Sequence, residues 1–596
     1  MKKLFKHPAF WGIIAALVVI VPQLSQYYPF GTDCIHIGVL EGIMDYPGMS
    51  PLNLYRFADG NQEHMTNVLS SGYFAWFSSL HWKIIFARHI PSLLMAVNHK
   101  ISGMNPLGYI IHSLLWYIAL IALLGLLFDR ILGAPPGKTH HPASYLAVLM
   151  FTFSTSHLEI LYYGATRWLL ITAAFAVAGL LAHLKWREQN WKPGRYLSVI
   201  AFALALLSGE AALAALAFLA AYELFGSDGT FKKKMTALLP TIILVGIYLL
   251  GYKLMGYGTG GQSYYINPLN EPIAFLLALP VRVASMLGEM FFGTLSLFGL
   301  NSNLPSFNGY ALLLGAGALV ICGLLFFPAW KNASPELRRT FKWLIIGTFA
   351  AMIPLSSGYP CARVTIIPFM GGSLILASIL TYWWKKLSPK KKIRENLKSP
   401  ISWIAGLICI AFFLLHLGYS PYRFFTDPQM LKLFNSITEE FNTKNTVLGE
   451  IKPNQEVVFL NSDKDVDLSN DYFYYRKLKR LPMPRYWWQL SYSLHKQHFT
   501  RTAPNALELD ITDGTVYDNY SSVYVLRSRE DPMKPGDIIK LPGLHITILA
   551  VNPDGPTRLE FKFDAALEDA RYRFFMFKEG KLLSVTPPPI GDSTEL

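Results

Sequence analysis

Charged side chains are scarce in this chain of 596 residues. They make up 15% of it, against roughly 25% in an average soluble protein, while hydrophobic residues make up 52%. A composition so poor in charge excludes an ordinary soluble protein. It predicts that most of the chain lies in a lipid bilayer.

Cysteine is also rare, and its spacing carries no motif. The four cysteines are Cys34, Cys322, Cys361 and Cys409. They lie too far apart in the sequence for a zinc or redox motif, and they are too few for a disulfide framework. We therefore expect no metal centre built on these cysteines. We also expect no cofactor; a divalent metal stays open, although nothing in the sequence indicates one.

Acidic residues are outnumbered by basic ones, 39 to 53, which gives a net charge of +14. The excess does not gather in one soluble region. Much of it lies in short basic linkers between apolar segments, at 185–195, 232–234, 331–342 and 385–398. Such linkers mark the cytoplasmic side of membrane proteins, so the charge predicts topology and argues against a nucleic-acid partner.

Apolar runs long enough to approach a bilayer core, about 17 to 25 residues, recur along the first two thirds of the chain. They are 9–27, 106–128, 143–163, 167–184, 236–255, 309–327, 340–358, 363–384 and 401–419. No small-residue cleavage site follows the first run. We therefore expect it to remain as an uncleaved helix.

Two further segments complete the predicted topology. The stretch 196–225 is too long for one span and lies between basic linkers, which predicts two short helices with Ser208-Gly209-Glu210 at the outer turn. The segment 273–300, interrupted by Pro280, Arg282 and Glu289, is expected to lie on or dip into the outer surface. About eleven crossings result, which places the N-terminus in the cytoplasm and the chain after about 420 outside it.

The chain changes character after residue 420. Short apolar or alternating segments at 457–460, 522–526, 545–549 and 559–563 predict strands, and 578–581 predicts a hairpin turn. The predicted fold is a polytopic α-helical membrane protein over residues 1–420, followed by a β-rich soluble domain over 421–596.

Ionisable residues gather at one depth of this topology, on the extracytoplasmic side. They are Asp33, Arg88, His89, His157, Glu159, Arg167, Glu210 and Arg363. Each one alone could be an interfacial anchor or an interhelical salt bridge. As a set, cations and carboxylates beside a lipid phase suit a lipid phosphate that carries a polar group, since cations neutralise phosphate and a carboxylate can accept a proton.

Four segments resemble one family. The family comprises the protein O-mannosyltransferase relatives that carry transmembrane helices and tetratricopeptide repeats, and their bacterial cousins. The segments that resemble its motifs, in the order of the chain, are GMNPLGYIIHSLL (103–115), HLEILYYGATR (157–167), LLSGEAAL (206–213) and ARVTIIP (362–368). The resemblance covers roughly residues 10 to 385. It implies a GT-C fold glycosyltransferase, although this chain lacks the tetratricopeptide repeats.

The resemblance also implies roles. Asp33, in FGTDC of the first outer loop, becomes the base that activates the acceptor, with Cys34 where relatives often carry a second acid. Arg88, Arg167, Arg363 and His157 would hold the donor phosphate. Glu159 and Glu210 would orient these cations or contact sugar hydroxyls, and a structural salt bridge is an equal alternative for each. His112 is out of register and is expected to be a packing residue.

The implied partners are a polyprenyl-phosphate-linked sugar and a protein or glycolipid acceptor, with the enzyme in a bacterial inner membrane and single displacement inverting the anomeric carbon. Alternatives are an O-antigen polymerase or ligase, a transporter, and a non-catalytic membrane scaffold. If Asp33 and Arg363 line one pocket, Cys34 and Cys361 should lie near each other, as separate thiols or as a disulfide.

Overall fold

The computed structural model describes residues 5–27, 29, 31–70, 72–134, 139–296, 307–387, 400–429, 451–461, 468–517, 523–578 and 581–595. The chain folds into two compact units. The helical unit comprises Met1–Tyr28, Phe86–Tyr257 and Ile266–Lys432, and the β-rich unit comprises Pro29–Ile85, Gly258–Tyr265 and Leu433–Leu596. The junction between the units at 432 lies outside the described residues, so the boundary expected near 420 stays a prediction. The β-rich unit also takes in two segments that precede it.

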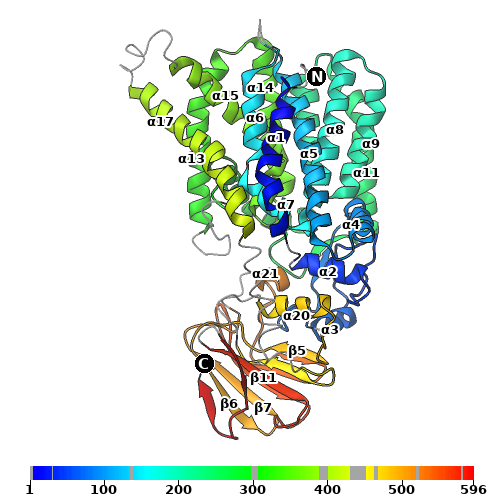
Figure 1. The fold of residues 1–596 in the computed structure, drawn as a ribbon, viewed down its shortest axis with the longest axis vertical. Coiled ribbons are helices and arrows are strands. Elements are labelled where there is room, and N and C mark those ends of the chain that lie inside the picture. The colour runs from blue at the N-terminus through cyan, green and yellow to red at the C-terminus, as the bar shows by residue number, and fades with distance from the viewer. Residues whose placement is uncertain are drawn as a thin grey trace. The chain divides into compact units, whose positions relative to one another are not determined.

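The helical unit is built from long apolar helices joined by short turns (Figure 1). Its α-helices are α1 (Pro8–Ile20), α4 (His89–Ser102), α5 (Pro106–Leu132), α6 (Pro142–Thr152), α7 (Leu158–Tyr162), α8 (Trp168–Gln189), α9 (Pro193–Ser208), α10 (Ala212–Ala221), α11 (Phe231–Leu254), α12 (Pro272–Phe292), α13 (Phe307–Lys331), α14 (Pro335–Leu355), α15 (Phe369–Leu387) and α17 (Pro400–Leu414). Its shorter helical turns are η1 (Val21–Gln26), η2 (Thr155–His157), η3 (Gly164–Thr166), η4 (Tyr222–Gly226), η5 (Ala362–Ile366) and η6 (Leu415–Tyr419).

Local sequence explains where several of these helices begin. Proline occupies the first position of α1, α5, α6 and α14, where its missing N–H costs nothing. The preceding side chain then accepts a hydrogen bond from a free backbone N–H. His7, Asn105, His141 and Ser334 do this for the four helices.

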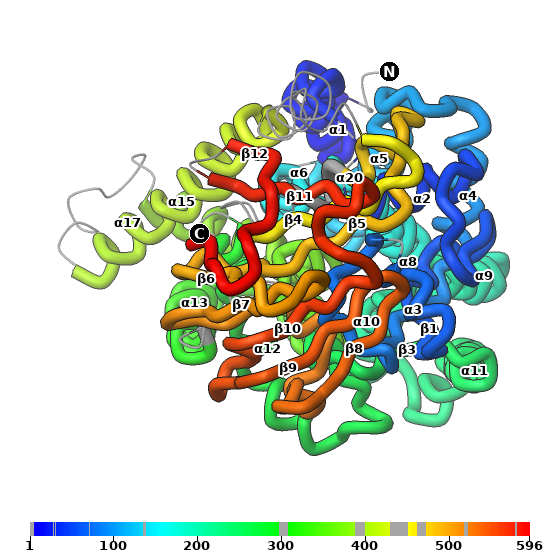
Figure 2. The backbone as a smooth tube through the Cα atoms, turned by 90° about the horizontal axis from the view of Figure 1, so that it is seen from below, coloured from blue at the N-terminus to red at the C-terminus, as the bar shows by residue number. Residues whose placement is uncertain are grey.

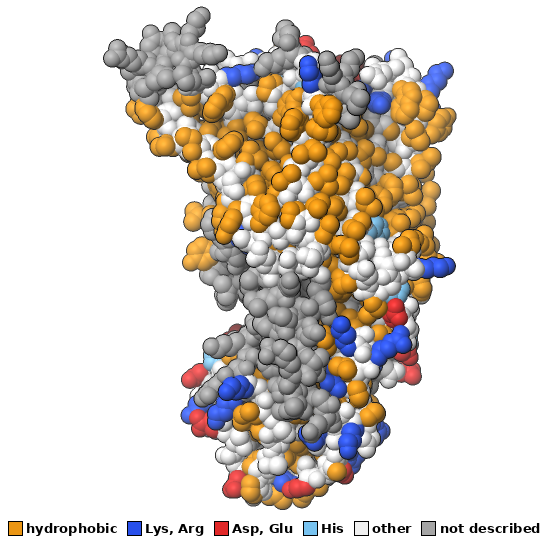
Figure 3. Space-filling model, viewed as in Figure 1, with side chains coloured by type: hydrophobic (Ala, Val, Ile, Leu, Met, Phe, Trp, Pro, Cys, Tyr) orange, Lys and Arg blue, Asp and Glu red, His pale blue; other side chains and the backbone are white. Residues whose placement is uncertain are grey.

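The surface of the helical unit is apolar. Hydrophobic side chains cover the face seen in Figure 3, and on α11 and α17 large aliphatic residues such as Ile247 and Ile401 are 65% and 75% exposed. A continuous apolar surface of this kind needs lipid rather than water around it. In the described part of the chain, seven helices are long and apolar enough to cross a membrane. The predicted multi-pass membrane protein is confirmed.

One predicted span is not a single helix. The run 143–163 forms α6, which has only 11 residues, and then breaks into η2, α7 and η3 before α8 begins. The hydroxyl-rich stretch 152–156 explains the break, because serine and threonine side chains offer the backbone alternatives to helical hydrogen bonds. Ser154 and Ser156 hydrogen-bond each other across it at 2.7 Å. The break carries the polar motif that begins at His157.

The predicted hairpin over 196–225 is present. α9 ends at Ser208 and α10 begins at Ala212, so Ser208-Gly209-Glu210 forms the turn. Glycine is required at position 209 by close packing, since a Cβ there would lie 2.3 Å from a ring carbon of Trp168. The α8 and α9 helices pack side by side (Figure 1).

The segment 273–300 is expected not to cross, and its described part forms α12, which is long and apolar enough to span a bilayer. Two hydrogen bonds tie α12 to neighbouring segments. Arg282, near its middle, donates a 2.7 Å hydrogen bond to the carbonyl of Ser356 just after α14. The carbonyl of Phe291, in its last turn, accepts one from His416 of η6 at 3.1 Å. That α12 does not cross the membrane stays a prediction.

The β-rich unit contains two larger sheets. The strands are β4 (Glu456–Phe459), β5 (Tyr486–Gln489), β6 (Gln497–Ala503), β7 (Ala506–Ile511), β8 (Ile538–Leu541), β9 (Leu544–Asn552), β10 (Gly555–Phe563), β11 (Tyr572–Lys578), β12 (Lys581–Val585) and β13 (Ser593–Glu595). Six form the sheet β13-β6-β7-β10-β9-β8 and four form β12-β11-β4-β5. Figure 2 shows β6, β7, β10, β9 and β8 crossing the unit in that order.

Alternating burial explains these strands. In β9 and β10, Ile546 pairs with Phe561 and Ile548 with Leu559, and all four side chains are fully buried. The predicted strands at 457–460, 545–549 and 559–563 are confirmed, as is the hairpin between β11 and β12, whose tip at 579–580 lies outside the described residues. The predicted strand at 522–526 is wrong. Its described part is the short helix α21 (Val523–Leu526).

The segment Pro29–Ile85, expected to be the first outer loop, belongs to the β-rich unit, and its aromatic residues are buried there. It contains α2 (Thr32–Leu40), α3 (Gln62–Ser70) and the strands β1 (Arg56–Asp59) and β2 (Lys83–Ile85), and β2 also pairs with β3 (Gly258–Gly260). The indole N–H of Trp76 donates a 3.1 Å hydrogen bond to the carbonyl of Leu490, and Phe77 has no exposed surface. Burial of these rings stabilises the packing of this segment against the rest of the β-rich unit.

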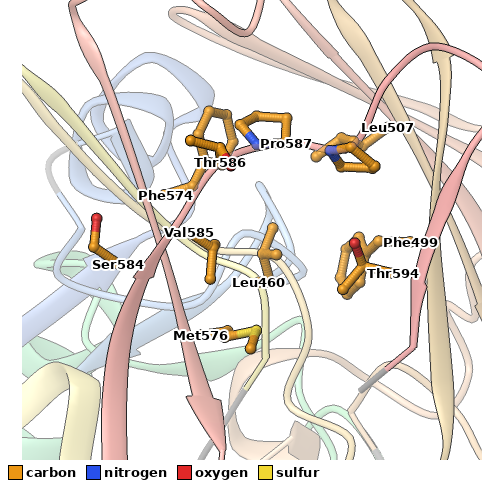
Figure 4. Close-up of a pocket in the computed structure, with 11 residues that line it drawn as sticks. Leu460, Phe499, Leu507, Phe574, Met576, Ser584, Val585, Thr586, Pro587 and Thr594 are labelled. Atoms are coloured by element: carbon orange, nitrogen blue, oxygen red, sulfur yellow. The ribbon is translucent and has the colours of Figure 1, made fainter.

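An apolar pocket of about 320 Å³ lies within the same unit (Figure 4). Phe499, Leu507 and Phe574 line it and are almost completely buried. Thr586, Pro587 and Pro588, which follow β12, also line it. The pocket carries no charged side chain.

Candidate active site

Two residues of the predicted polar layer meet at the break after α6. Glu159, in α7, accepts a hydrogen bond from the guanidinium of Arg363, in η5, and the two form an ion pair. The side chain of Glu159 is 38% exposed and that of Arg363 is 27% exposed. Both charged groups therefore remain within reach of a ligand.

A pocket of about 340 Å³ adjoins this pair. Its size is at the lower end of the range for small-molecule sites, about 300 to 1,000 Å³. It is lined by Thr155, Ser156, Leu158, Glu159, Leu295, Ser296, Tyr359, Pro360, Cys361, Ala362 and Asp427. Hydroxyl groups and two carboxylates dominate its polar side, a lining suited to a polyhydroxylated ligand.

Asp427 is a pocket residue that the sequence did not single out. It lies beyond the last apolar run and accepts a 2.5 Å hydrogen bond from the Nε–H of Arg423, one turn earlier. The two form an ion pair. A signal existed in the sequence, because an acid just outside a predicted span is an interfacial residue by position.

Buried polar contacts hold the walls of the pocket. The carboxylate of Glu289 accepts hydrogen bonds from the backbone N–H groups of Leu295 and Ser296, at 2.7 and 3.1 Å, and from the Ser296 hydroxyl at 2.5 Å. The Ser296 hydroxyl is also 2.7 Å from that of Thr155. Glu289 thus fixes one pocket wall against the segment that leads to Glu159.

Arg88 and Glu210, also predicted site residues, form a second charged pair. Arg88 donates through Nε to Glu210 at 3.2 Å, and Glu210 also accepts from the backbone of Ala87 at 3.1 Å and from the hydroxyl of Tyr252 at 3.4 Å. The Arg88 guanidinium lies 3.6 Å from the centre of the Trp168 ring. Planar stacking of this kind holds arginine in a fixed orientation. Tyr252, in α11, was not predicted.

Arg167 is buried among protein acceptors. Its guanidinium donates to the carbonyl of Tyr109 at 2.7 Å and to the hydroxyl of Ser113 at 2.9 Å, and it lies 3.1 Å from Nδ1 of His112. The residue is 3% exposed. These contacts favour a positioning role that ties α5 to the start of α8. His112 is a hydrogen-bond partner in this network.

His157 is buried as well. Its Nδ1 lies 3.1 Å from the hydroxyl of Tyr117, and its ring packs 4.5 Å from that of Phe151. Its Nε2 has no hydrogen-bond partner in the described part of the chain. His89, another member of the predicted layer, pairs with Tyr257 at 2.9 Å.

Asp33 lies in the β-rich unit, in the first turn of α2, and its side chain has no exposed surface. A carboxylate near the start of a helix is favoured by the free N–H groups and the helix dipole. The neighbouring Cys34 is buried and donates to the carbonyl of Pro29 at 3.4 Å. All four cysteines are free thiols in the structure. The nearness of Cys34 to Cys361 stays a prediction.

No family model and no curated protein matches the chain. Among solved structures, it is similar to ArnT from Cupriavidus metallidurans bound to undecaprenyl phosphate, with 12% identity, a TM-score of 0.37, and coverage of 79% of this chain and 85% of that one. The apo state of the same protein gives 13% identity, a TM-score of 0.39, and coverage of 79% and 84%.

Proposed function

We propose that the protein is a GT-C glycosyltransferase that moves a sugar from a polyprenyl-phosphate donor to an extracytoplasmic protein or glycolipid acceptor. The observation that supports this most is the Glu159–Arg363 pair beside a hydroxyl-lined pocket, at the end of a bundle with an apolar surface. A lipid-linked sugar phosphate requires that combination. The hydrocarbon chain of the lipid belongs in the bilayer, and the sugar phosphate needs cations and hydrogen-bond partners at the membrane surface.

Arg363 is the proposed phosphate ligand. When the bond between the anomeric carbon and the phosphate oxygen breaks, negative charge grows on the departing lipid phosphate. The planar guanidinium can form two hydrogen bonds to it. Glu159, which holds Arg363 in the free protein, is then placed to accept hydrogen bonds from sugar hydroxyls. Electrostatic stabilisation of this kind is commonly the largest part of such catalysis.

The acceptor hydroxyl has to lose its proton as its oxygen attacks. A carboxylate is the usual group for this task, and the family resemblance assigns it to Asp33. Asp427 is the alternative on structural grounds, because its carboxylate lines the pocket itself. Attack on the side opposite the phosphate in one displacement inverts the anomeric carbon.

The other predicted ligands divide into two roles. Arg88 and Glu210 form a charged pair with partly accessible side chains, 10% and 26% exposed, which suits contact with the donor. Arg167 and His157 are buried and bound by neighbouring side chains. We assign them to positioning: they hold the helix ends from which Glu159 projects. No metal or other cofactor has a role in this mechanism.

The proposed location is a bacterial inner membrane, with the N-terminus in the cytoplasm and the β-rich unit outside. The basic linkers support this orientation, since Lys- and Arg-rich loops stay on the cytoplasmic side. The charged pairs and the pocket would then face the extracytoplasmic surface, where a flipped polyprenyl-phosphate sugar presents its head group.

Transfer by the purified full chain tests the proposal. We expect proteoliposomes supplied with synthetic polyprenyl-phosphate hexoses to form a glycosylated acceptor detectable by mass spectrometry, and cells that lack the gene to lose one glycan or glycolipid. Polyprenyl-diphosphate donors serve as the matched comparison. Transfer from diphosphate donors alone, or identical glycans in both kinds of cell, would contradict the proposal.

A further inference from the structure

Three metal-ligating side chains meet away from the candidate active site. His7 precedes α1, Asp129 lies in the last turn of α5, and His140 comes shortly before α6. One donor atom from each lies within 4.8 Å of the other two. The whole of α6, 11 residues or about 16 Å, separates His140 from the segment that lines the pocket. The proposed transfer reaction does not use these residues.

Their donor atoms lie close together. Oδ1 of Asp129 is 2.7 Å from Nδ1 of His140, and Oδ2 is 3.8 Å from Nε2 of His7. The two imidazole rings are 5.2 Å apart and nearly perpendicular. Donor atoms around a tetrahedral zinc ion, with bonds of about 2.0 to 2.2 Å, lie about 3.3 Å apart. The observed separations fall on either side of that value.

We propose that His7, Asp129 and His140 bind a divalent transition metal of the zinc and cobalt type, with two nitrogen ligands, one oxygen ligand and one position open to water. Two imidazoles and a carboxylate form a common ligand set for such ions. The side chains are 21%, 24% and 14% exposed, so an ion can enter and yet be largely enclosed.

The contacts around His7 and His140 show which hydrogen bond metal binding would replace and which helices it would join. Nδ1 of His7 accepts a 3.2 Å hydrogen bond from the N–H of Ala9, so coordination through Nε2 exchanges this helix cap for a metal bond. His140 does not cap a helix, because the N-cap of α6 is His141. The Tyr145 hydroxyl already hydrogen-bonds the carbonyl of Lys6 across the same segments. A bound ion would fasten the start of α1 to the end of α5 and the start of α6.

Cobalt titration of the full chain, purified without a histidine tag and treated with EDTA, tests this site. We expect Co²⁺ to bind at one per chain with the visible absorption of a four- or five-coordinate nitrogen and oxygen site, and Zn²⁺ to displace it. His140→Ala and the isosteric Asp129→Asn should each weaken binding more than tenfold, since even outer groups of metal sites cost about 10 to 100-fold. His141→Ala, which changes the adjacent histidine, should leave the affinity within twofold.

Thermal unfolding and size-exclusion profiles of the metal-free variants separate loss of ligands from loss of fold, and Asp129→Asn changes the shape of the site least. Thiolate charge-transfer absorption from bound cobalt would assign the ion to a cysteine and overturn the proposal. So would unchanged binding when His7, Asp129 and His140 are all replaced, or an equal loss of affinity in His141→Ala.

Discussion

Glu159 and Arg363 form an ion pair although 204 residues separate them in the chain. Each lies in a short helical turn that interrupts the apolar bundle, α7 for Glu159 and η5 for Arg363, and the segments just before them, η2 and the start of η5, contact each other. Charged groups are costly inside a bilayer, so a pair that is partly exposed beside a pocket is placed for a ligand more than for stability.

Arg363→Gln should lower the rate constant of sugar transfer by about 10² to 10³, because it removes a donor aimed at charge that develops in the transition state. Arg363→Lys should recover part of the loss, since it keeps the charge without the planar fork. Transfer by proteoliposomes at saturating donor measures both. Arg338→Gln is the matched control, because Arg338 lies in the first turn of α14, at the end away from Arg363. Near-full activity of Arg363→Gln would remove Arg363 from the phosphate site.

Asp33→Asn and Asp427→Asn distinguish the two candidate bases. The enzyme should lose about 10² to 10⁴ in rate when its base is replaced by the isosteric amide, because nothing then accepts the acceptor's proton. We expect that loss in Asp33→Asn and a smaller one in Asp427→Asn. Equal folding of both variants, judged by thermal unfolding, is the control. The reverse order would place the base in the pocket of the helical unit.

Arg167→Gln should act mainly on stability. Its guanidinium supplies hydrogen bonds to Tyr109 and Ser113 in a buried site, and hydrogen bonds to a charged group contribute about 1.5 to 3 kcal/mol each. We expect a clear fall in the unfolding temperature in detergent, with the donor KM of the remaining folded enzyme nearly unchanged. The exposed Lys385→Gln is the control. An unchanged unfolding temperature together with a raised KM would make Arg167 a donor ligand instead.

The sequence places several of the candidate residues near span ends but does not show how they pair. Hydropathy and charge bias place Glu159, Glu210 and Arg363 near span ends, because these signals act locally along the chain. The pairs themselves join Glu159 to Arg363 and Arg88 to Glu210 through tertiary packing, which no local signal contains. The sequence likewise cannot separate Arg363, which pairs with a carboxylate that lines a pocket, from a buried arginine such as Arg167.

One error in the fold has a tertiary origin. Val523-Tyr524-Val525-Leu526 has strand-forming composition, yet it forms a helical turn, and its tertiary contacts include a 2.8 Å hydrogen bond from the N–H of Ser263 to the carbonyl of Tyr524. Strand propensity yields readily to such contacts. The segment 29–85 also packs through tertiary contacts, since Trp76 and Phe77 are buried in the β-rich unit.

The orientation of the chain gives the last prediction. Basic linkers should hold residues near Lys385 in the cytoplasm, and the last span, which includes α17, should carry the β-rich unit to the outside. In a variant whose four cysteines are replaced by serine, Lys540→Cys, exposed on β8, should react in intact cells with a membrane-impermeant maleimide. Lys385→Cys should react only after the membrane is opened. Both variants must keep transfer activity, so that labelling reports the native topology. Labelling of Lys385→Cys but not of Lys540→Cys in intact cells would reverse the orientation, and the proposed site would then face the cytoplasm.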